Sequence, residues 1–119
     1  MGFVKLKVKK LHPDAKVPCY AYPGDSGMDL YSVEEAVLQP GQRRVVRTGI
    51  AIALPKGFEA QVRPKSGLAA TFGITVLNTP GTVDSSYRGE IAVIMANFGQ
   101  KEYIVEKGKK IAQMVIAKV

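Results

Sequence analysis

The sequence predicts an all-β fold of the sandwich or jelly-roll type, with at most one short helix. Apolar residues recur at every second position in several short runs, which is the spacing of a strand with one face turned to a core. Turns containing proline and glycine separate these runs at intervals of roughly 8–15 residues. Short strands at such intervals are typical of packed antiparallel sheets.

Four runs carry the alternation. In residues 4–8 valine and leucine alternate with lysine, which predicts a strand with one buried and one basic face. In residues 50–54 and 91–96 apolar residues fill the alternate positions as well, so we expect both strands to be covered on both sides. The last run, residues 111–117, repeats the alternation but is interrupted by Gln113.

Turn and helix signals lie between the runs. Residues 67–72 (GLAATF) predict one short helical turn directly after a proline, lysine and serine. Proline presets one backbone angle and glycine tolerates positive φ, so pairs of these residues favour tight turns. The predicted turns are Pro13-Asp14, Pro23-Gly24, Pro40-Gly41, Pro55-Lys56-Gly57, Pro80-Gly81 and Lys107-Gly108.

Composition narrows the class of protein. With 119 residues, 46% of them hydrophobic and 23% charged, the chain is expected to form one globular domain over residues 1–119. The N-terminal segment has no hydrophobic block of the signal-peptide kind, and no apolar run approaches the length of a membrane span. Cys19 is the only cysteine, which excludes an internal disulfide and favours the cytoplasm. The net charge of +7 favours polyanionic partners, although it could serve solubility alone.

Two polar, glycine-rich segments lie in the first 70 residues. Residues 24–30 (GDSGMDL) place two carboxylates and two glycines before a strand, which a solvated loop would also explain. Residues 63–69 (RPKSGLA) put a basic residue, a hydroxyl and a glycine at the expected helix start. Free backbone N–H groups and the positive end of the helix dipole favour a phosphate there. A serine N-cap without a ligand is the alternative.

Two further segments follow. Residues 78–90 (NTPGTVDSSYRGE), folded as a hairpin, would bring backbone groups, the Asp84 carboxylate and the Tyr87 ring to one place. The carboxylate could act on water as a general base and the ring could stack on a sugar, whereas a turn without a ligand is the alternative. In residues 108–113 (GKKIAQ), Gln113 needs hydrogen-bond partners, which a phosphate, a water or a cross-strand contact could supply.

In this order and spacing, the four segments resemble the first four motifs of the trimeric dUTP pyrophosphatases, from about residue 13 to residue 119. The third motif, GTVDSSYRG at residues 81–89, is specific, and the second and fourth are moderately so. The resemblance implies a jelly-roll-like dUTPase β-barrel or sandwich, assembled as a homotrimer with active sites at subunit interfaces. It also implies hydrolysis of dUTP to dUMP and pyrophosphate, which keeps uracil out of DNA and supplies dUMP for thymidylate synthesis.

The resemblance assigns roles to individual residues. Asp84 would contact the deoxyribose 3′-hydroxyl and orient the water that attacks the α-phosphorus, and Tyr87 would lie under the sugar and exclude a 2′-hydroxyl. Gln113 would contact a phosphate or that water, and Asp29 would support the metal and water network. The expected catalytic residues are therefore Asp84, Asp29 and Gln113. A hairpin too tight for the methyl group of thymine would reject dTTP.

The implied ligands follow from the same resemblance. Mg²⁺ is the expected cofactor, bound chiefly by the triphosphate and water, because this ion dehydrates reluctantly. We expect dUTP as the partner, and neither nucleic acid nor a membrane. The expected substrate-binding residues are Lys65, Ser66 and Gly67 at the phosphates, Asn78 and the main chain of Thr82 and Val83 at the uracil edge, and in addition Gly81, Asp84, Tyr87 and Ala92.

The sequence departs from the family pattern at three places. Lys65 stands where the family usually has arginine. Lysine keeps the charge but cannot make a bidentate contact, so phosphate binding is expected to be weaker or rearranged. Lys109 and Lys110 replace an acidic residue and an arginine, which adds positive charge either near the site or only on the surface. The sequence stops at Val119, before the glycine-rich fifth motif, and we expect that this C-terminal arm was truncated or omitted; a protein that works without it is the alternative.

Three other functions compete. A dCTP deaminase shares the fold, but its catalytic glutamate falls at Ile94, which cannot shuttle protons. A non-catalytic dUTP-binding or regulatory module on the same trimer would bind dUTP without turnover. A nucleic-acid-binding β-barrel would need aromatic residues interleaved with basic ones along its strands, and a cluster of three tyrosines at positions 20, 22 and 31 is the only hint of this.

Overall fold

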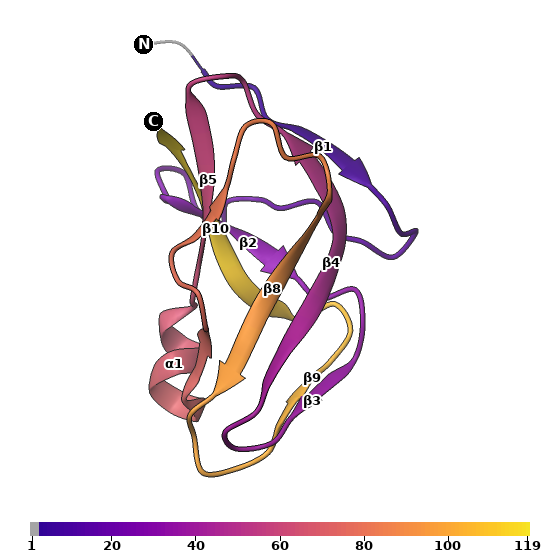
Figure 1. Cartoon of the computed structure of the whole chain (residues 1–119), viewed down its shortest axis with the longest axis vertical. Helices are drawn as coiled ribbons and strands as arrows, with labels where there is room; N and C mark the ends of the chain where they lie inside the picture. The colour runs from indigo at the N-terminus through magenta and orange to yellow at the C-terminus, as the bar shows by residue number, and fades with distance from the viewer. Residues whose placement is uncertain (1–2) are drawn as a thin grey trace.

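The structure is a computed structural model that describes residues 3–119. Two four-stranded antiparallel sheets, with strand orders β1-β4-β8-β6 and β2-β10-β5-β7, enclose the core, and β3 pairs with β9. Figure 1 shows the long strands β4 and β8 side by side, with α1 and the β3–β9 pair toward the end of the molecule away from both termini. The elements are β1 (Lys7–Lys10), β2 (Gly27–Tyr31), β3 (Ala36–Leu38), β4 (Arg43–Ala53), β5 (Phe58–Arg63), α1 (Ser66–Phe72), β6 (Ile74–Val76), β7 (Gly81–Val83), β8 (Glu90–Asn97), β9 (Tyr103–Val105) and β10 (Lys110–Lys118).

The predicted all-β class and the predicted short helix at residues 67–72 are confirmed by this architecture. Both sheets contribute to one hydrophobic cluster among the described residues. Its largest fully buried members include Leu30 of β2, Ile50 of β4, Met95 of β8 and Met114 of β10. No helix within residues 3–119 is long and apolar enough to cross a membrane.

The first predicted strand was placed too early. β1 begins at Lys7, and Val4 is 41% exposed, so the buried face expected over residues 4–8 is only partly formed. β1 is an edge strand that pairs with β4 alone, with Lys7 opposite Ala53. Leu6 and Val8 pack against the core from this edge and stay half-buried, because no second strand covers them within the described residues.

The prediction of strands buried on both faces is partly confirmed. In residues 50–54 it holds except at Ala53, which is half-buried, and in residues 91–96 it fails at Ala92 and Ile94 but holds at Ala96, which is 4% exposed. In the first run Ile50, Ala51, Ile52 and Leu54 are buried. In β8 the residues Ile91, Val93 and Met95 fill the core, whereas Ala92 and Ile94 on the outer face remain partly exposed. Within the described residues no element covers Ala92 and Ile94, so this part of the outer face is an apolar surface.

The alternation predicted over residues 111–117 is broken by a register shift. β10 pairs with β2 through a shift between Lys110 and Ala112, so Ile111 and Ala112 are both buried. Met114 continues the buried face, while Gln113 and Val115 lie on the other face and are half-buried. The predicted turn at Pro80-Gly81 also differs, because Gly81 opens β7 and pairs with Val62.

Asn97, the last residue of β8, joins the end of β3 to the loop between β8 and β9. Its side chain is 1% exposed, donates from Nδ2 to the carbonyl oxygens of Leu38 (3.0 Å) and Lys101 (2.9 Å), and accepts from the Gly99 N–H at Oδ1 (2.8 Å). The bond to Leu38 is buried and the other two are part-buried, so exchanging this amide for a group of different polarity would leave polar partners unsatisfied.

We expect Asn97→Asp to lower the free energy of unfolding by about 3 kcal/mol, because a carboxylate oxygen would then face the carbonyl oxygens of Leu38 and Lys101, the first of them in a buried contact. Urea unfolding at fixed protein concentration measures this change. Asn78→Asp is the matched control, since Asn78 is exposed; its effect should stay within about 0.5 kcal/mol. Equal losses in the two variants would contradict the assignment.

Candidate active site

Three of the four polar segments meet because of strand register. β10 lies between β2 and β5, and Gln113 is directly opposite Asp29 on one side and Arg63 on the other. The Gln113 amide donates from Nε2 to the carbonyl oxygen of Pro64 at 2.9 Å. Of the partners expected for Gln113, a cross-strand polar contact is thus present, and the first, second and fourth segments form one continuous surface.

Gly27 makes room for the Gln113 side chain. A Cβ atom at Gly27 would overlap Oε1 of Gln113 and would lie 3.0 Å from its Cδ and 3.1 Å from its Cβ. Gly27 pairs with Val115 in the same ladder, so neither strand can shift without breaking the register that places Gln113. The glycine in the first segment therefore has a steric role.

Asp29 is a buried carboxylate with two cationic partners. It is 4% exposed; Lys65 donates to its Oδ1, and the Lys110 ammonium lies 3.3 Å from its Oδ2. Burial by itself would raise the pKa of this carboxyl, but the hydrogen bonds and charges of Lys65 and then Lys110 outweigh burial and hold the pKa below its ordinary value. Asp29 is therefore an anion at neutral pH, and Lys110, for which a surface position was the alternative, belongs to the site.

The start of α1 differs from the serine-cap alternative. Lys65, in extended conformation, is the N-cap and makes no side-chain cap, whereas Ser66 is the first helical residue. The first bond of the helix runs from the Ala69 N–H to the Lys65 carbonyl oxygen at 3.1 Å, so the N–H groups of Ser66 and Gly67 have no acceptor within the helix. Ser66, Gln113, Pro64 and other residues line an open hollow of about 440 Å³.

The third segment forms a second hollow. The hairpin predicted over residues 78–90 is not formed, because β7 pairs with β5 in one sheet and β8 lies in the other sheet. The chain turns between the two sheets instead, and the Tyr87 N–H donates to the Asp84 carbonyl oxygen at 3.0 Å. We call the cavity beside this turn the hairpin hollow, although β7 and β8 are not paired. Thr82, Val83, Asp84, Tyr87 and Ala92 border a hollow of about 290 Å³, and Ile94 is among its other lining residues. The structure thus brings five of the predicted substrate-binding residues together, with one exposed carboxylate and one ring that is 46% exposed.

Asn78 and Gly81 lie at the start of this segment and do not border the second hollow. Asn78 is exposed, and its Nδ2 would be 3.2 Å from a Cβ at Gly81. The Tyr87 ring is held at the other end, because its hydroxyl donates to the Glu90 carbonyl oxygen at 2.9 Å. Gly89 lies beneath that ring, and a Cβ there would be 2.5 Å from the hydroxyl oxygen.

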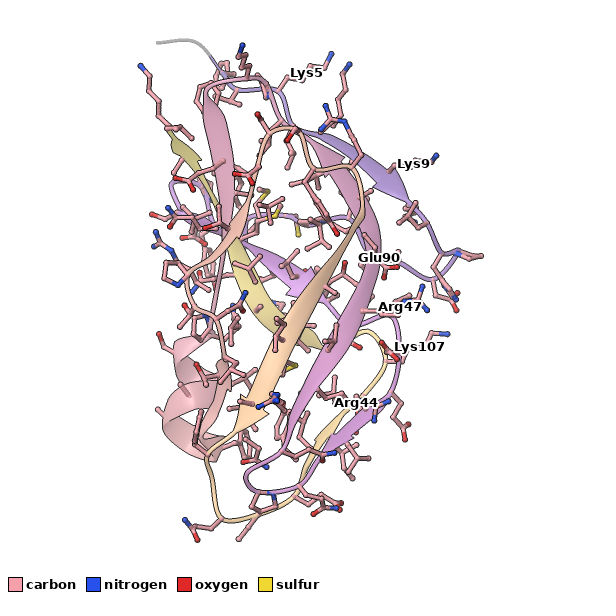
Figure 2. All side chains as sticks on the ribbon, viewed as in Figure 1. Lys5, Lys9, Arg44, Arg47, Glu90 and Lys107 are labelled. Carbon is pink, nitrogen blue, oxygen red and sulfur yellow. The ribbon has the colours of Figure 1, made fainter. Side chains whose placement is uncertain are left out.

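The sequence did not predict the contacts of Glu90 that fix the end of this segment. The Glu90 carboxylate accepts from Nε of Arg47 at 3.1 Å and from the Gly49 N–H at 3.0 Å. Figure 2 shows Arg47 and Glu90 near each other, where β4 and β8 run together. The register between these strands shifts between Arg47 and Ala51, and Glu90 bonds across the shift. Glu90 is the last residue of the third polar segment, residues 78–90, but nothing in the sequence indicated Arg47 as its partner.

The two hollows are separated within one chain. Val83 pairs with Ala60 of β5, and Pro64 directly follows the end of β5 four residues later, which corresponds to about 13 Å at 3.3 Å per residue. Asp84 extends beyond Val83 and away from Pro64. The hairpin hollow and the hollow at Ser66 and Gln113 are thus at different places on the described chain. No group of three or more His, Cys, Asp or Glu side chains in residues 3–119 is arranged to hold a metal ion.

Comparisons with known proteins identify the family. Residues 13–119 match the family model described as dUTPase. The deoxyuridine 5′-triphosphate nucleotidohydrolase of Clostridium tetani is 58% identical over 111 residues, covering 93% of this chain and 77% of that protein. The protein of the same name from a Hydrogenobaculum species is 58% identical over 117 residues, covering 98% and 81%.

Solved structures show the same fold. The dUTPase of Staphylococcus bacteriophage 80alpha superposes with a TM-score of 0.90 at 25% identity, covering 97% of this chain and 90% of that one. The same phage dUTPase with dUPNHPP also has a TM-score of 0.90 at 25% identity, covering 97% and 83%. A mutant dUTPase from phage phi11 of S. aureus, which coordinates a structural Mg(II) ion, has a TM-score of 0.90 at 23% identity, covering 97% and 91%.

We expect Gly27→Ala to lower Tm by about 5–10 °C, because the added methyl group would displace Gln113 from the Pro64 carbonyl oxygen. Calorimetry measures Tm, and Gly67→Ala is the control, since its Cβ would meet nothing within 4 Å. The double variant Gly27→Ala/Gln113→Ala should recover most of the loss. A Tm that does not recover would show that the overlap with Gln113 is not the cause.

Proposed function

The chain belongs to the dUTPase family, and we propose that it hydrolyses dUTP to dUMP and pyrophosphate. The observation that carries this function is the hairpin hollow, where an exposed carboxylate at Asp84 and a ring at Tyr87 border one cavity with Thr82 and Val83. A carboxylate, a ring and strand backbone at one place are the groups needed to activate water beside a nucleoside. The chain also covers most of the relatives that carry the nucleotidohydrolase name.

Asp84 is the residue we assign to the attacking water. It contacts the deoxyribose 3′-hydroxyl, orients a water molecule toward the α-phosphorus and accepts a proton from it. The new phosphorus–oxygen bond forms as the bond from the α-phosphorus to the bridging oxygen breaks, and pyrophosphate leaves. This role is supported by the exposure of Asp84, which lies in a turn that the bond between Tyr87 N–H and the Asp84 carbonyl fixes.

The same segment selects the sugar and the base of the substrate. Tyr87 lies under the deoxyribose and leaves no room for a 2′-hydroxyl, a role supported by the hydroxyl bond and the glycine that hold its ring in place. Asn78 and the backbone of Thr82 and Val83 read the edge of uracil, with Gly81 at the start of β7 and Ala92 on the wall of the hollow.

The triphosphate extends to the start of α1. Lys65 contributes a charge, and the N–H groups of Ser66 and Gly67, which have no acceptor within the helix, contribute donors. Gln113 contacts a phosphate or the catalytic water from β10. Mg²⁺, when bound with the triphosphate, supplies charge stabilisation at the leaving pyrophosphate. The Asp29 carboxylate is already engaged by two lysines, so its part in the metal and water network is indirect.

We propose that the chain acts as a homotrimer in which each site draws on two or more subunits. The separation of the two hollows within one chain supports this arrangement. The outer face of β8 supports it too, because Ala92 and Ile94 would be covered by a neighbouring subunit. One dUTPase-like domain over residues 1–119 is supported by the single hydrophobic cluster, although residues 1–2 lie outside the described residues. The lone, exposed Cys19 suits a cytoplasmic location.

Deamination of dCTP and non-catalytic binding of dUTP are both less well supported than hydrolysis of dUTP. Ile94 borders the hairpin hollow, so the position of a deaminase's glutamate holds an apolar side chain. The non-catalytic alternative is not favoured, because the curated relatives are nucleotidohydrolases at 58% identity.

We expect pyrophosphate release from dUTP, and at most slow release from UTP, dTTP and dCTP. Asp84→Asn should lower kcat at least about 100-fold, while a dUTP analogue with an imido group between the α- and β-phosphates still binds. Asp14→Asn is the control, since Asp14 is an exposed carboxylate paired with Lys107 outside the site. Ammonia release from dCTP, or a normal kcat in Asp84→Asn, would contradict the proposal.

We expect Asp84→Asn and Gln113→Ala chains to complement each other when they are refolded together. If the hairpin hollow of one subunit faces Gln113 of another, mixed trimers contain an intact site. Random assortment at equal amounts should then restore about a quarter of the wild-type rate. A mixture no more active than its separate components would show that one chain builds the whole site.

A further inference from the structure

Asp29 links the start of α1, where the triphosphate is proposed to bind, to the start of β10. Its two oxygens are divided between two lysines from different elements: Lys65, the N-cap of α1, takes Oδ1, and Lys110, the first residue of β10, lies 3.3 Å from Oδ2. The lysine side chains are 31% and 52% exposed, whereas that of Asp29 is 6% exposed. The carboxylate is thus fixed inside the protein, and the two ammonium groups lie at its surface.

The charges of this cluster decide what Lys65 can offer a phosphate. A buried carboxylate must be paired, and a lone Lys65 would be largely neutralised by Asp29. With Lys110 present, two positive charges face one negative charge, so the cluster keeps a net charge of +1. An ammonium has three donors, so Lys65 can hold Asp29 and still donate outward.

The identity of the two residues strengthens this point. Both Lys65 and Lys110 stand where the resemblance led us to expect arginine. One guanidinium could hold both oxygens of a carboxylate in a bidentate pair, but a lysine ammonium is a point charge and holds one. With lysine at both positions, each oxygen of Asp29 needs its own partner, and the loss of either lysine leaves a buried oxygen unpaired.

We propose that Lys110 is a positioning residue for dUTP hydrolysis: it binds Oδ2 of Asp29, offsets part of the negative charge that faces Lys65, and thereby lets Lys65 be directed at the triphosphate. The inference rests on the proposed function and extends it to a residue that contacts neither of the two hollows. Lys110 acts through Asp29, the residue whose Oδ2 its ammonium faces.

Lys109 offers a matched control for charge. It is the adjacent residue, is also exposed, and lies with its ammonium 5.2 Å from the centre of the Tyr103 ring, away from Asp29. Lys109→Gln and Lys110→Gln remove the same charge from neighbouring positions. Only Lys110→Gln removes a partner of Asp29, so a general electrostatic effect and a positioning effect give different results.

The test measures KM and kcat for dUTP in both variants. We expect Lys110→Gln to raise KM about tenfold, the effect of losing one charge-assisted hydrogen bond, with kcat within about threefold of wild type. Lys109→Gln should leave both constants near the wild-type values, and Lys110→Arg should restore KM. Circular dichroism checks that each variant is folded, and equal KM values for the two glutamine variants would overturn the inference.

A double-mutant cycle tests whether Lys110 acts through Asp29. The affinity for the imido analogue of dUTP is measured in the wild type, Asp29→Asn, Lys110→Gln and the double variant. If Lys110 acts through Asp29, adding Lys110→Gln to Asp29→Asn should change the affinity less than twofold. A further tenfold loss would overturn the inference. If the wild type itself released no pyrophosphate from dUTP, the proposed function would fail instead, and the analogue titration would still report on Lys110.

Discussion

The register of three strands is the constraint on which the phosphate end of the molecule depends. Gln113 of β10 is opposite both Asp29 of β2 and Arg63 of β5, so segments that are far apart in sequence arrive at one level of one sheet. A shift of one residue would turn Gln113 toward the core and Met114 outward. The shift between Lys110 and Ala112 absorbs the mismatch before the site, so Ile111 and Ala112 can both be buried while Gln113 stays beside Pro64.

The segment from β7 to Glu90 is held in place by a different set of contacts. Its strand β7 has only three residues and pairs with β5 alone, so its own backbone bonds are few. Glu90 compensates, because its carboxylate binds Arg47 and the Gly49 N–H of β4 while its carbonyl oxygen receives the Tyr87 hydroxyl. One residue therefore ties an exposed ring to the longest strand of the opposite sheet. The ring is held by backbone and ion-pair contacts and not by burial, which leaves its face accessible to a ligand.

Sequence patterns predicted the features that depend on residues close together in the chain. The all-β class, the short helix and the strand at residues 50–54 follow from alternation and turn residues, and the four polar segments follow from residue type. The start of β1, the shift at Lys110 and the pairing of Glu90 with Arg47 were missed because each depends on a partner distant in sequence. The predicted burial of Ala92 and Ile94 failed for the same kind of reason, since composition shows that a face is apolar but not which chain covers it.

The apolar outer face of β8 connects assembly to binding. Ala92 and Ile94 belong both to that face and to the wall of the hairpin hollow. A neighbouring subunit that covered the face would bury apolar surface, which is favourable by roughly 25 cal/mol per Å², and would narrow the same hollow around a nucleoside. A ligand that bound only the completed hollow would in turn stabilise the assembled state by mass action. If a neighbouring subunit covers this face, as proposed, substrate binding and subunit association should therefore be coupled.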